Sequence, residues 1–215
     1  MRGRRGGAGR FFVLEGLDGA GTTTQAQRLA DRLRRARRRV HVTSEPSGGP
    51  VGALVRQVLT RRVVGGALGR EGLDPAALAL LFAADRLDHA AVEIAPRLAR
   101  GSVVISDRFT LSSLAYQAVS CGDPAWVEAL NERAPVPDAT LFLEVSPRTA
   151  LARRFAASDR RELFEVPAFQ RRVARSYRAA IERLRAAGQR VLVVDGERPV
   201  EEVTAALVRA VEPLL

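Results

Sequence analysis

The chain has 215 residues, of which 47% are hydrophobic and 27% are charged, and its formal net charge is +10. This length suits one substantial core, so a single domain is expected. No apolar run approaches the roughly 20 residues of a membrane span, and the start of the chain leads into a strand rather than a signal-peptide core, which predicts a cytoplasmic protein without a membrane partner.

The single cysteine, Cys121, has no partner for an internal disulfide, and no Cys/His cluster has metal-ligand spacing, which fits a reducing compartment. We expect Cys121 to be an inert thiol near a helix boundary.

All 34 basic residues are arginine, because the sequence contains no lysine. Clustered positive charges favour binding to nucleic acid, because they displace the counterions of its phosphates. However, aromatic residues make up only 5% of the chain and form no basic-aromatic stacking platform, so nucleic acid is not an expected partner. The arginines from Arg34 to Arg39 are interpreted as a solvated helix end.

Short apolar, β-branched runs alternate with helical patterns along the chain. Five runs predict strands: "FFVLEGL" from Phe11, "VHVTSE" from Val40, "SVVISD" from Ser102, "ATLFLEV" from Ala139 and "RVLVVDG" from Arg190. Eight helical patterns cover Thr23–Arg39, Pro50–Thr60, Pro75–Arg100, Leu111–Ala118, Pro124–Arg133, Pro147–Ala157, Pro167–Ala187 and Val200–Leu214. This alternation predicts an α/β fold of three layers with a parallel five-stranded sheet.

The stretch "EGLDGAGTTTQ" from Glu15 differs by one residue from the phosphate-loop pattern G-x-x-x-x-G-K-[ST], because Thr22 occupies the lysine position. It lies between a predicted strand and a helix, as the motif requires. Backbone amides and the helix N-terminus can cradle phosphates, and Thr23 is the expected Mg²⁺ hydroxyl ligand. The alternative is a turn whose glycines only relieve backbone strain. The expected phosphate-binding residues are Gly16, Asp18, Gly19, Ala20, Gly21, Thr22, Thr23 and Thr24.

Together with "EGLDGAG", four later stretches resemble the thymidylate kinase family: "SEPSGGPVG" from Ser44, "LLFAADRLDH" from Leu80, "SDRFTLSSLAYQ" from Ser106 and "DRRELFEVPAFQRRV" from Asp159. The resemblance runs from Phe11 to the C-terminal helix. It implies a P-loop NTPase fold, with one nucleoside monophosphate kinase domain at residues 11–215 after an Arg/Gly-rich arm at 1–10 that we expect to be disordered. It also implies transfer of phosphate from ATP with Mg²⁺ to dTMP, giving dTDP for dTTP synthesis, and a homodimer.

Phe82 and Arg86 are four residues apart on a predicted helix and therefore share a face. The resemblance implies that Phe82 stacks on thymine and that Arg86 holds the base. The alternative is a core phenylalanine beside a surface arginine.

The resemblance implies further site residues around the acceptor. Asp107 and Arg108 follow a strand, at the edge where parallel sheets bind ligands, and with Arg160 they are the expected catalytic residues. The family usually has D-R-Y, whereas this chain has Phe109. The expected dTMP-binding residues are Asp18, Glu45, Pro46, Arg56, Phe82, Arg86, Arg108, Ser112, Tyr116 and Gln117. The expected metal ligands are Thr23, Asp107 and Glu45. Tyr116 is alternatively a helix-packing residue.

The arginine-rich segment at about residues 153–167 resembles a mobile lid over ATP, which excludes water and delivers cations. The resemblance places Arg153 on adenine and Arg160 at the transferring phosphates. Gly19 takes the P-loop position that holds arginine in other members, which indicates the bacterial lid-arginine type. The alternative is a solvated arginine-rich surface.

Loss of the P-loop lysine leaves rival functions open. We expect Arg160, Arg108 and the loop amides to supply the missing charge stabilisation. The alternatives are a catalytically impaired nucleotide-binding protein of the same fold, a related nucleoside or nucleotide kinase, and a nucleic-acid-binding module with the arm "RGRRGGAGR".

Overall fold

The computed structural model describes residues 9–60, 73–157 and 167–215. Five parallel strands form one sheet in the order β2-β3-β1-β4-β5. The strands are β1 (Arg10–Gly16), β2 (Val40–Ser44), β3 (Val103–Asp107), β4 (Ala139–Glu144) and β5 (Val191–Asp195). Both the parallel sheet and its five strands confirm the sequence-based prediction.

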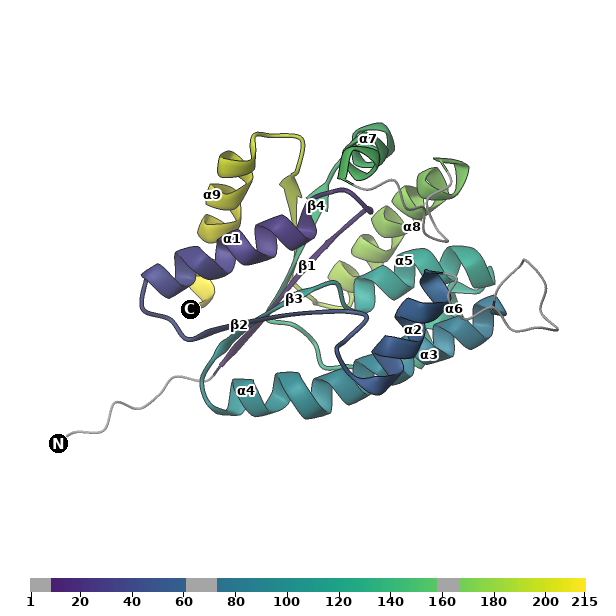
Figure 1. Cartoon of the computed structure of the whole chain (residues 1–215), viewed down its shortest axis with the longest axis horizontal. Helices are drawn as coiled ribbons and strands as arrows, with labels where there is room; N and C mark the ends of the chain where they lie inside the picture. Colours follow the sequence, from purple (N-terminus) through teal and green to yellow (C-terminus); the bar gives the residue numbers. More distant parts are fainter. Residues whose placement is uncertain (1–8, 61–72, 158–166) are drawn as a thin grey trace.

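Helices cover both faces of the sheet, which gives the three predicted layers (Figure 1). The helices are α1 (Thr22–Arg35), α2 (Pro50–Leu59), α3 (Pro75–His89), a π-helical turn (Ala90–Ile94), α4 (Ala95–Ala99), α5 (Thr110–Cys121), α6 (Pro124–Leu130), α7 (Pro147–Ala157), α8 (Pro167–Ala186), α9 (Val200–Val211) and a final 3₁₀ turn (Glu212–Leu214). Helices α1 and α9 pack together on one face, and α5 and α8 pack together on the other. Within the described part of the chain, no helix is both long and apolar enough to cross a membrane.

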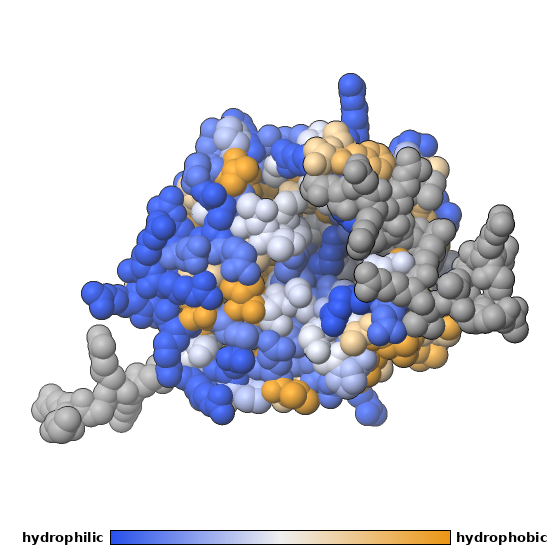
Figure 2. All heavy atoms as spheres, in the orientation of Figure 1, coloured by the Kyte–Doolittle hydropathy of each residue, from blue (hydrophilic) through white to orange (hydrophobic). Residues whose placement is uncertain are grey.

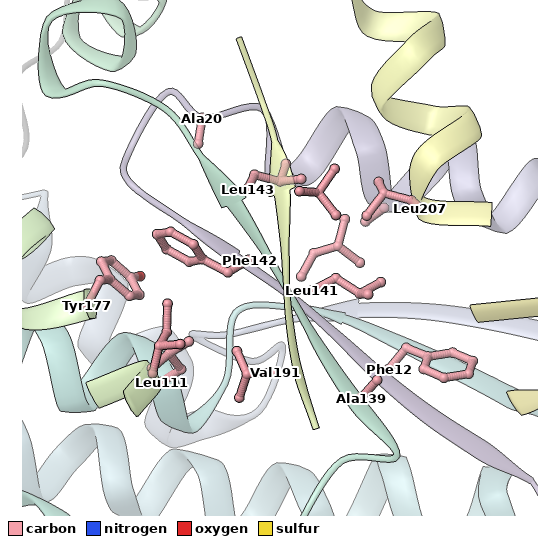
Figure 3. Packing of buried hydrophobic residues seen from close by; sticks show 14 of the residues in the cluster. Phe12, Ala20, Leu111, Ala139, Leu141, Phe142, Leu143, Tyr177, Val191 and Leu207 are labelled. Carbon is pink, nitrogen blue, oxygen red and sulfur yellow. The ribbon is translucent and has the colours of Figure 1, made fainter. Parts of the chain in front are cut away.

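Alternate side chains of β1 face opposite layers, as the period of two requires. Phe12 and Leu14 belong to the main core with Leu29 of α1. Phe11 and Val13 belong to a second cluster on the other face. Figure 3 shows the main core continuing along β4 to Tyr177 of α8, whose ring centroid lies 4.9 Å from that of Phe142. The same face of β1 that carries Phe11 and Val13 also carries Glu15, a polar residue that is fully buried.

Helix α6 ends at Leu130 rather than at Arg133, and two other helix predictions need larger corrections. Helix α1 ends at Arg35 rather than Arg39, because Arg37 adopts a left-handed φ of 62° and Arg38 N donates to Leu33 O at 3.0 Å, which closes the helix. The helix expected over residues 75–100 changes to a π-helical turn at Ala90–Ile94, just before Pro96. Proline has no N–H and clashes with the preceding turn, and a wider turn accommodates it.

Candidate active site

Two neighbouring cavities open at the carboxyl edge of the sheet. One, of about 510 Å³, lies over the P-loop between β1 and α1. The other, of about 120 Å³, is lined by α3, α5 and the segment after β2. Asp18 and Arg108 line both cavities, so these two side chains stand where the cavities meet.

The P-loop has the backbone that its glycines allow. Gly19 and Gly21 have φ of 90° and 94°, values that side chains disfavour. A Cβ at Gly19 would lie 2.1 Å from the carbonyl oxygen of Ala150, so the loop touches α7 there. Thr22, in the lysine position, is buried at 6% exposure. All of the expected phosphate-binding residues line the 510 Å³ cavity except Gly16.

Arg108 is held in an uncommon backbone conformation directly after β3. Its φ is 74°, and its amide donates to Leu14 O at 2.9 Å. Its guanidinium donates to Asp18 Oδ1 at 2.6 Å, to Gly16 O at 3.1 Å and to Ser112 Oγ at 3.1 Å. A non-glycine residue with positive φ is strained, and such strain concentrates at functional sites. In this backbone conformation the guanidinium lies between the two cavities and lines both.

Asp107 and Thr23 meet beside the P-loop, as expected of metal ligands. Thr23 Oγ1 donates to Asp107 Oδ2 at 2.5 Å. The other carboxylate oxygen, Oδ1, is buried and has no hydrogen-bond partner among the described residues. Buried polar atoms are rarely left unpaired. The pair therefore offers a hydroxyl and a free carboxylate oxygen, which is the chemistry that Mg²⁺ prefers.

Arg86 is completely buried against the smaller cavity, with 1% exposure. Its Nη2 lies 2.6 Å from Glu45 Oε2, and its Nη1 donates to Ser113 Oγ at 3.0 Å and to Asn131 Oδ1. Phe82, one turn earlier on α3, lines the same cavity. The alternative of a surface arginine is therefore wrong for Arg86.

The carboxylate of Glu45 faces Arg86 rather than Thr23. One oxygen accepts from Arg86, and the other lies 3.2 Å from Nδ1 of the buried His89. Only its backbone reaches Asp107, by an N–H···O bond of 3.0 Å. Glu45 is thus placed apart from the Thr23–Asp107 pair with which the sequence grouped it as a metal ligand.

The remaining acceptor residues lie largely where the sequence placed them. Every expected dTMP-binding residue lines the smaller cavity except Arg56, which donates from Nη1 to the carbonyl oxygens of Pro46 and Ser47. The hydroxyl of Tyr116 accepts from Asp18 N at 3.1 Å. Phe109, which replaces the expected tyrosine, is buried with its ring 5.1 Å from that of Phe11 and 5.3 Å from the guanidinium carbon of Arg86.

The far end of the P-loop cavity is lined by arginines. Arg153 donates from Nη1 to Gly196 O at 2.9 Å, in the loop after β5. Arg154, one of the arginines that the resemblance placed in the lid, lines the cavity as well. So does Arg198, which sequence reasoning did not single out. Arg160, and with it most of the expected lid, lies outside the described residues.

Sequence reasoning also missed buried residues that hold the site together. Glu15 accepts from the amide of Phe109, and the Tyr177 hydroxyl accepts from Arg108 Nη1 at 3.4 Å. Asp85 accepts from Ser47 N at 2.7 Å, which fixes the segment after β2. Glu15 lies within the quoted P-loop stretch, and an acidic residue ending an apolar strand was the available signal; Tyr177 lies in an unremarkable helical pattern.

Comparison with known proteins agrees with this geometry. The sequence model of the family described as "Thymidylate kinase" matches residues 14–207. The chain belongs to the thymidylate kinase family. It is 40% identical to the "Probable thymidylate kinase" of Pyrobaculum calidifontis over 94% of this chain and 95% of that protein, and 41% identical to the "Thymidylate kinase" of Thermomicrobium roseum over 92% and 91%.

In this thymidylate kinase family member, Thr22 stands at the lysine position of the phosphate-loop pattern. The matched range contains every expected site residue. A cavity of about 510 Å³ lies over its P-loop, and the buried Thr22 is part of the lining. The P-loop fold predicted from the resemblance is thereby confirmed.

Proposed function

We propose that the protein transfers the γ-phosphoryl group of ATP to dTMP and so forms dTDP. The observation that carries this proposal is the position of Asp18 and Arg108 between a P-loop cavity and a cavity lined by Phe82 and Arg86. Two nucleotides bound on either side would bring their phosphates together at Arg108. Catalysis of phosphoryl transfer consists mainly of such positioning and of charge stabilisation.

In the smaller cavity, the base would lie against Phe82, beside the Arg86 guanidinium. All five N–H donors of Arg86 already have acceptors in the protein, on Glu45, Ser113, Asn131 and the carbonyl of Phe109, so a base carbonyl would have to share one of these donors. Tyr116 would pack near the sugar, and its hydroxyl is fixed by the amide of Asp18. Because these groups are already held in place, little free energy is spent on ordering them when the nucleotide binds.

For the donor, the P-loop amides would hold the phosphates of ATP, and Arg153 would contact the adenine. Thr23 and Asp107 would hold Mg²⁺, supported by the unpartnered Oδ1 of Asp107. When bound, the metal neutralises phosphate charge during transfer. Asp107, placed by β3, keeps its carboxylate beside Thr23 for that purpose.

Charge stabilisation would come from Arg108 and Arg160 in place of a P-loop lysine. Removing one such preorganised group commonly reduces kcat by about 10²–10³-fold. We therefore expect Arg160→Ala to abolish most turnover. Thr22→Lys should raise kcat less than about tenfold, since a cation is already supplied. A large rescue of a nearly inactive parent by Thr22→Lys would show instead that the lysine loss is disabling.

We also propose a homodimer through α2 and α3. Figure 2 shows a hydrophobic area over these helices. Leu54 of α2 and Leu80 and Leu87 of α3 are exposed by 40%, 51% and 38%. Light scattering on the purified protein measures the mass, and Leu80→Glu should yield monomers whose melting temperature is lower than that of the parent, because association stabilises the folded state.

The deciding experiment is a coupled assay of ADP release with ATP, Mg²⁺ and dTMP. Parallel reactions with dUMP, dCMP and dGMP measure acceptor selectivity. We expect ADP release that depends on dTMP, with weaker rates for the other acceptors. Binding of dTMP without any ADP release would favour the nucleotide-binding alternative.

A further inference from the structure

Glu15 is a carboxylic acid sealed inside the protein at the point where β1 becomes the P-loop. Its exposure is 0%. It shares a face of β1 with Phe11 and Val13, so the strand directs it toward α5 and α8. No substrate reaches it directly, because it lines neither cavity.

Four donors converge on this carboxylate. Oε1 accepts from Phe109 N at 2.8 Å and Ser112 N at 3.0 Å. Oε2 accepts from Ser112 Oγ at 2.6 Å, and the Tyr177 hydroxyl, whose one proton is shared between Oε2 at 3.2 Å and Gly16 O at 3.1 Å, is the fourth donor. Glu15 therefore connects β1 with Phe109, with the first turn of α5 through Ser112, and with α8 through Tyr177.

Burial raises the pKa of Glu15 from its usual 4.5 to about 7, although the positive charge of Arg108 and the hydrogen bonds from Ser112 and Phe109 oppose this rise. The charged and titratable groups around it are Arg108 from the turn after β3 and Tyr177 from α8, while Asp18 and Asp107 act on Arg108. Arg108 is the one cation among them, so the ionised state of Glu15 depends on Arg108.

The hydroxyl of Ser112 connects Glu15 to the acceptor cavity. Ser112 Oγ accepts from Arg108 Nη1 at 3.1 Å, and Ser112 lines that cavity. While Glu15 is ionised, the Ser112 proton points to Oε2. Once Oε2 carries a proton, it donates to Ser112 Oγ instead, and the hydroxyl proton of Ser112 must turn to another acceptor. Inside the protein the Tyr177 hydroxyl, 3.1 Å away, is one such acceptor, and a phosphate bound at Arg108 offers a second acceptor that is charged.

We propose that Glu15 is a positioning residue that takes up a proton from solvent when a phosphate dianion binds at Arg108, and that this uptake turns the Ser112 hydroxyl toward the phosphate. The dianion offsets the Arg108 charge that keeps Glu15 ionised and adds negative charge nearby, and both effects favour the neutral acid. The proposal deepens the proposed function, since it relies on an acceptor phosphate at Arg108.

Calorimetry of dTMP binding without ATP tests the proposal. At pH 8 dTMP is already a dianion, because a phosphate monoester has its second pKa near 6, so proton uptake then reports on the protein. Titrations in buffers of different ionisation enthalpy should show uptake approaching about one proton per dTMP. The Kd for dTMP should weaken by up to about tenfold per pH unit above pH 7.5.

Glu15→Gln imitates the neutral acid, because its amide can donate to Ser112 Oγ while its oxygen accepts both backbone amides. We expect no proton uptake, a Kd independent of pH between 7.5 and 8.5, and binding at pH 8.5 tighter than in the parent. If Glu15 only stabilised the fold, Glu15→Gln would weaken dTMP binding at every pH. The matched control is Glu144→Gln at the end of β4, where the side chain is 50% exposed, and it should keep the uptake.

A second readout does not need catalysis or the variant. Carbon NMR of the nucleotide-free protein should show a glutamate carboxyl titrating near pH 7, with the amide signals of Phe109 and Ser112 moving at the same midpoint. Added dTMP, or orthophosphate if dTMP does not bind, should raise that midpoint. An unshifted midpoint, or equal uptake in Glu15→Gln, overturns the proposal. Failure of dTMP to bind while the midpoint moves with orthophosphate would instead count against the proposed function.

Discussion

Asp18 Oδ1 and Arg108 Nη2 lie 2.6 Å apart and join the P-loop to the turn after β3. Asp18 also presents its amide to the Tyr116 hydroxyl, and Arg108 also donates to Gly16 O. One ion pair thus links the strand end, the phosphate loop and helix α5. Both cavities are lined by this pair, so a displacement of either residue alters both cavities.

The positive φ of Arg108 can be tested apart from its charge. Arg108→Ala and Arg108→Gly both remove the guanidinium, so each should lower kcat/KM for dTMP by about 100-fold or more. Only alanine retains the left-handed strain at φ 74°, so the glycine variant should be more stable than the alanine variant by about 1 kcal/mol. Urea unfolding measures the difference. Arg178→Ala, on exposed α8 surface, is the control; equal stabilities of the two Arg108 variants would argue against strain.

Gly19 is limited by space as well as by its backbone. Gly19→Ala would place a Cβ 2.1 Å from Ala150 O, whereas Gly122, with φ 72°, has nothing within 4 Å of such a Cβ. Gly122→Ala should therefore cost about 1 kcal/mol of unfolding free energy, and Gly19→Ala roughly 1–3 kcal/mol more. Thermal unfolding of both variants checks this. Similar losses would mean that α7 shifts freely away from the loop.

The Glu45–Arg86 pair should matter for stability far more than an exposed pair. Glu45→Gln leaves the fully buried Arg86 without its counter-ion, and we expect a loss of about 3 kcal/mol in urea unfolding. Glu201→Gln, which breaks the exposed pair with Arg28, should cost less than about 1 kcal/mol. A small loss at Glu45 would indicate that water reaches Arg86 in the variant and solvates its charge.

The raised pKa of Glu15 predicts a pH-dependent stability. The unfolded chain releases this proton near pH 4.5, whereas the folded protein holds it to about pH 7. The folded state therefore binds more protons between these values, and the contribution of Glu15 to stability falls as pH rises from 4.5 to 7, by roughly 3 kcal/mol in all.

The measurement is the difference in unfolding free energy between the parent and Glu15→Gln from pH 5 to 8. The parent should lose stability relative to the variant as pH rises through this window. A difference that stays constant with pH would place the pKa of Glu15 near its usual value.

The local parts of this protein could be predicted from its sequence. The strand runs, the helices between them and the glycines of "EGLDGAGTTTQ" depend on periodicity and backbone freedom within a few residues. The predicted end of α1 was wrong, because nothing in the local sequence indicates that Arg37 adopts a left-handed backbone conformation. The grouping of acceptor residues came from the family resemblance, and the structure brings nearly all of them to one cavity.

Tertiary structure alone decided how the charged residues are used. Arg86 is buried because Glu45, 41 residues earlier, comes to lie within 2.6 Å of it. Glu15 is a buried acid because Phe109, Ser112 and Tyr177, up to 162 residues away, converge on it. The pKa of a carboxyl depends on solvent exclusion and on charges within a few ångströms. Those distances arise only once strands and helices pack, so the identities of the residues are set by the sequence and their protonation by the fold.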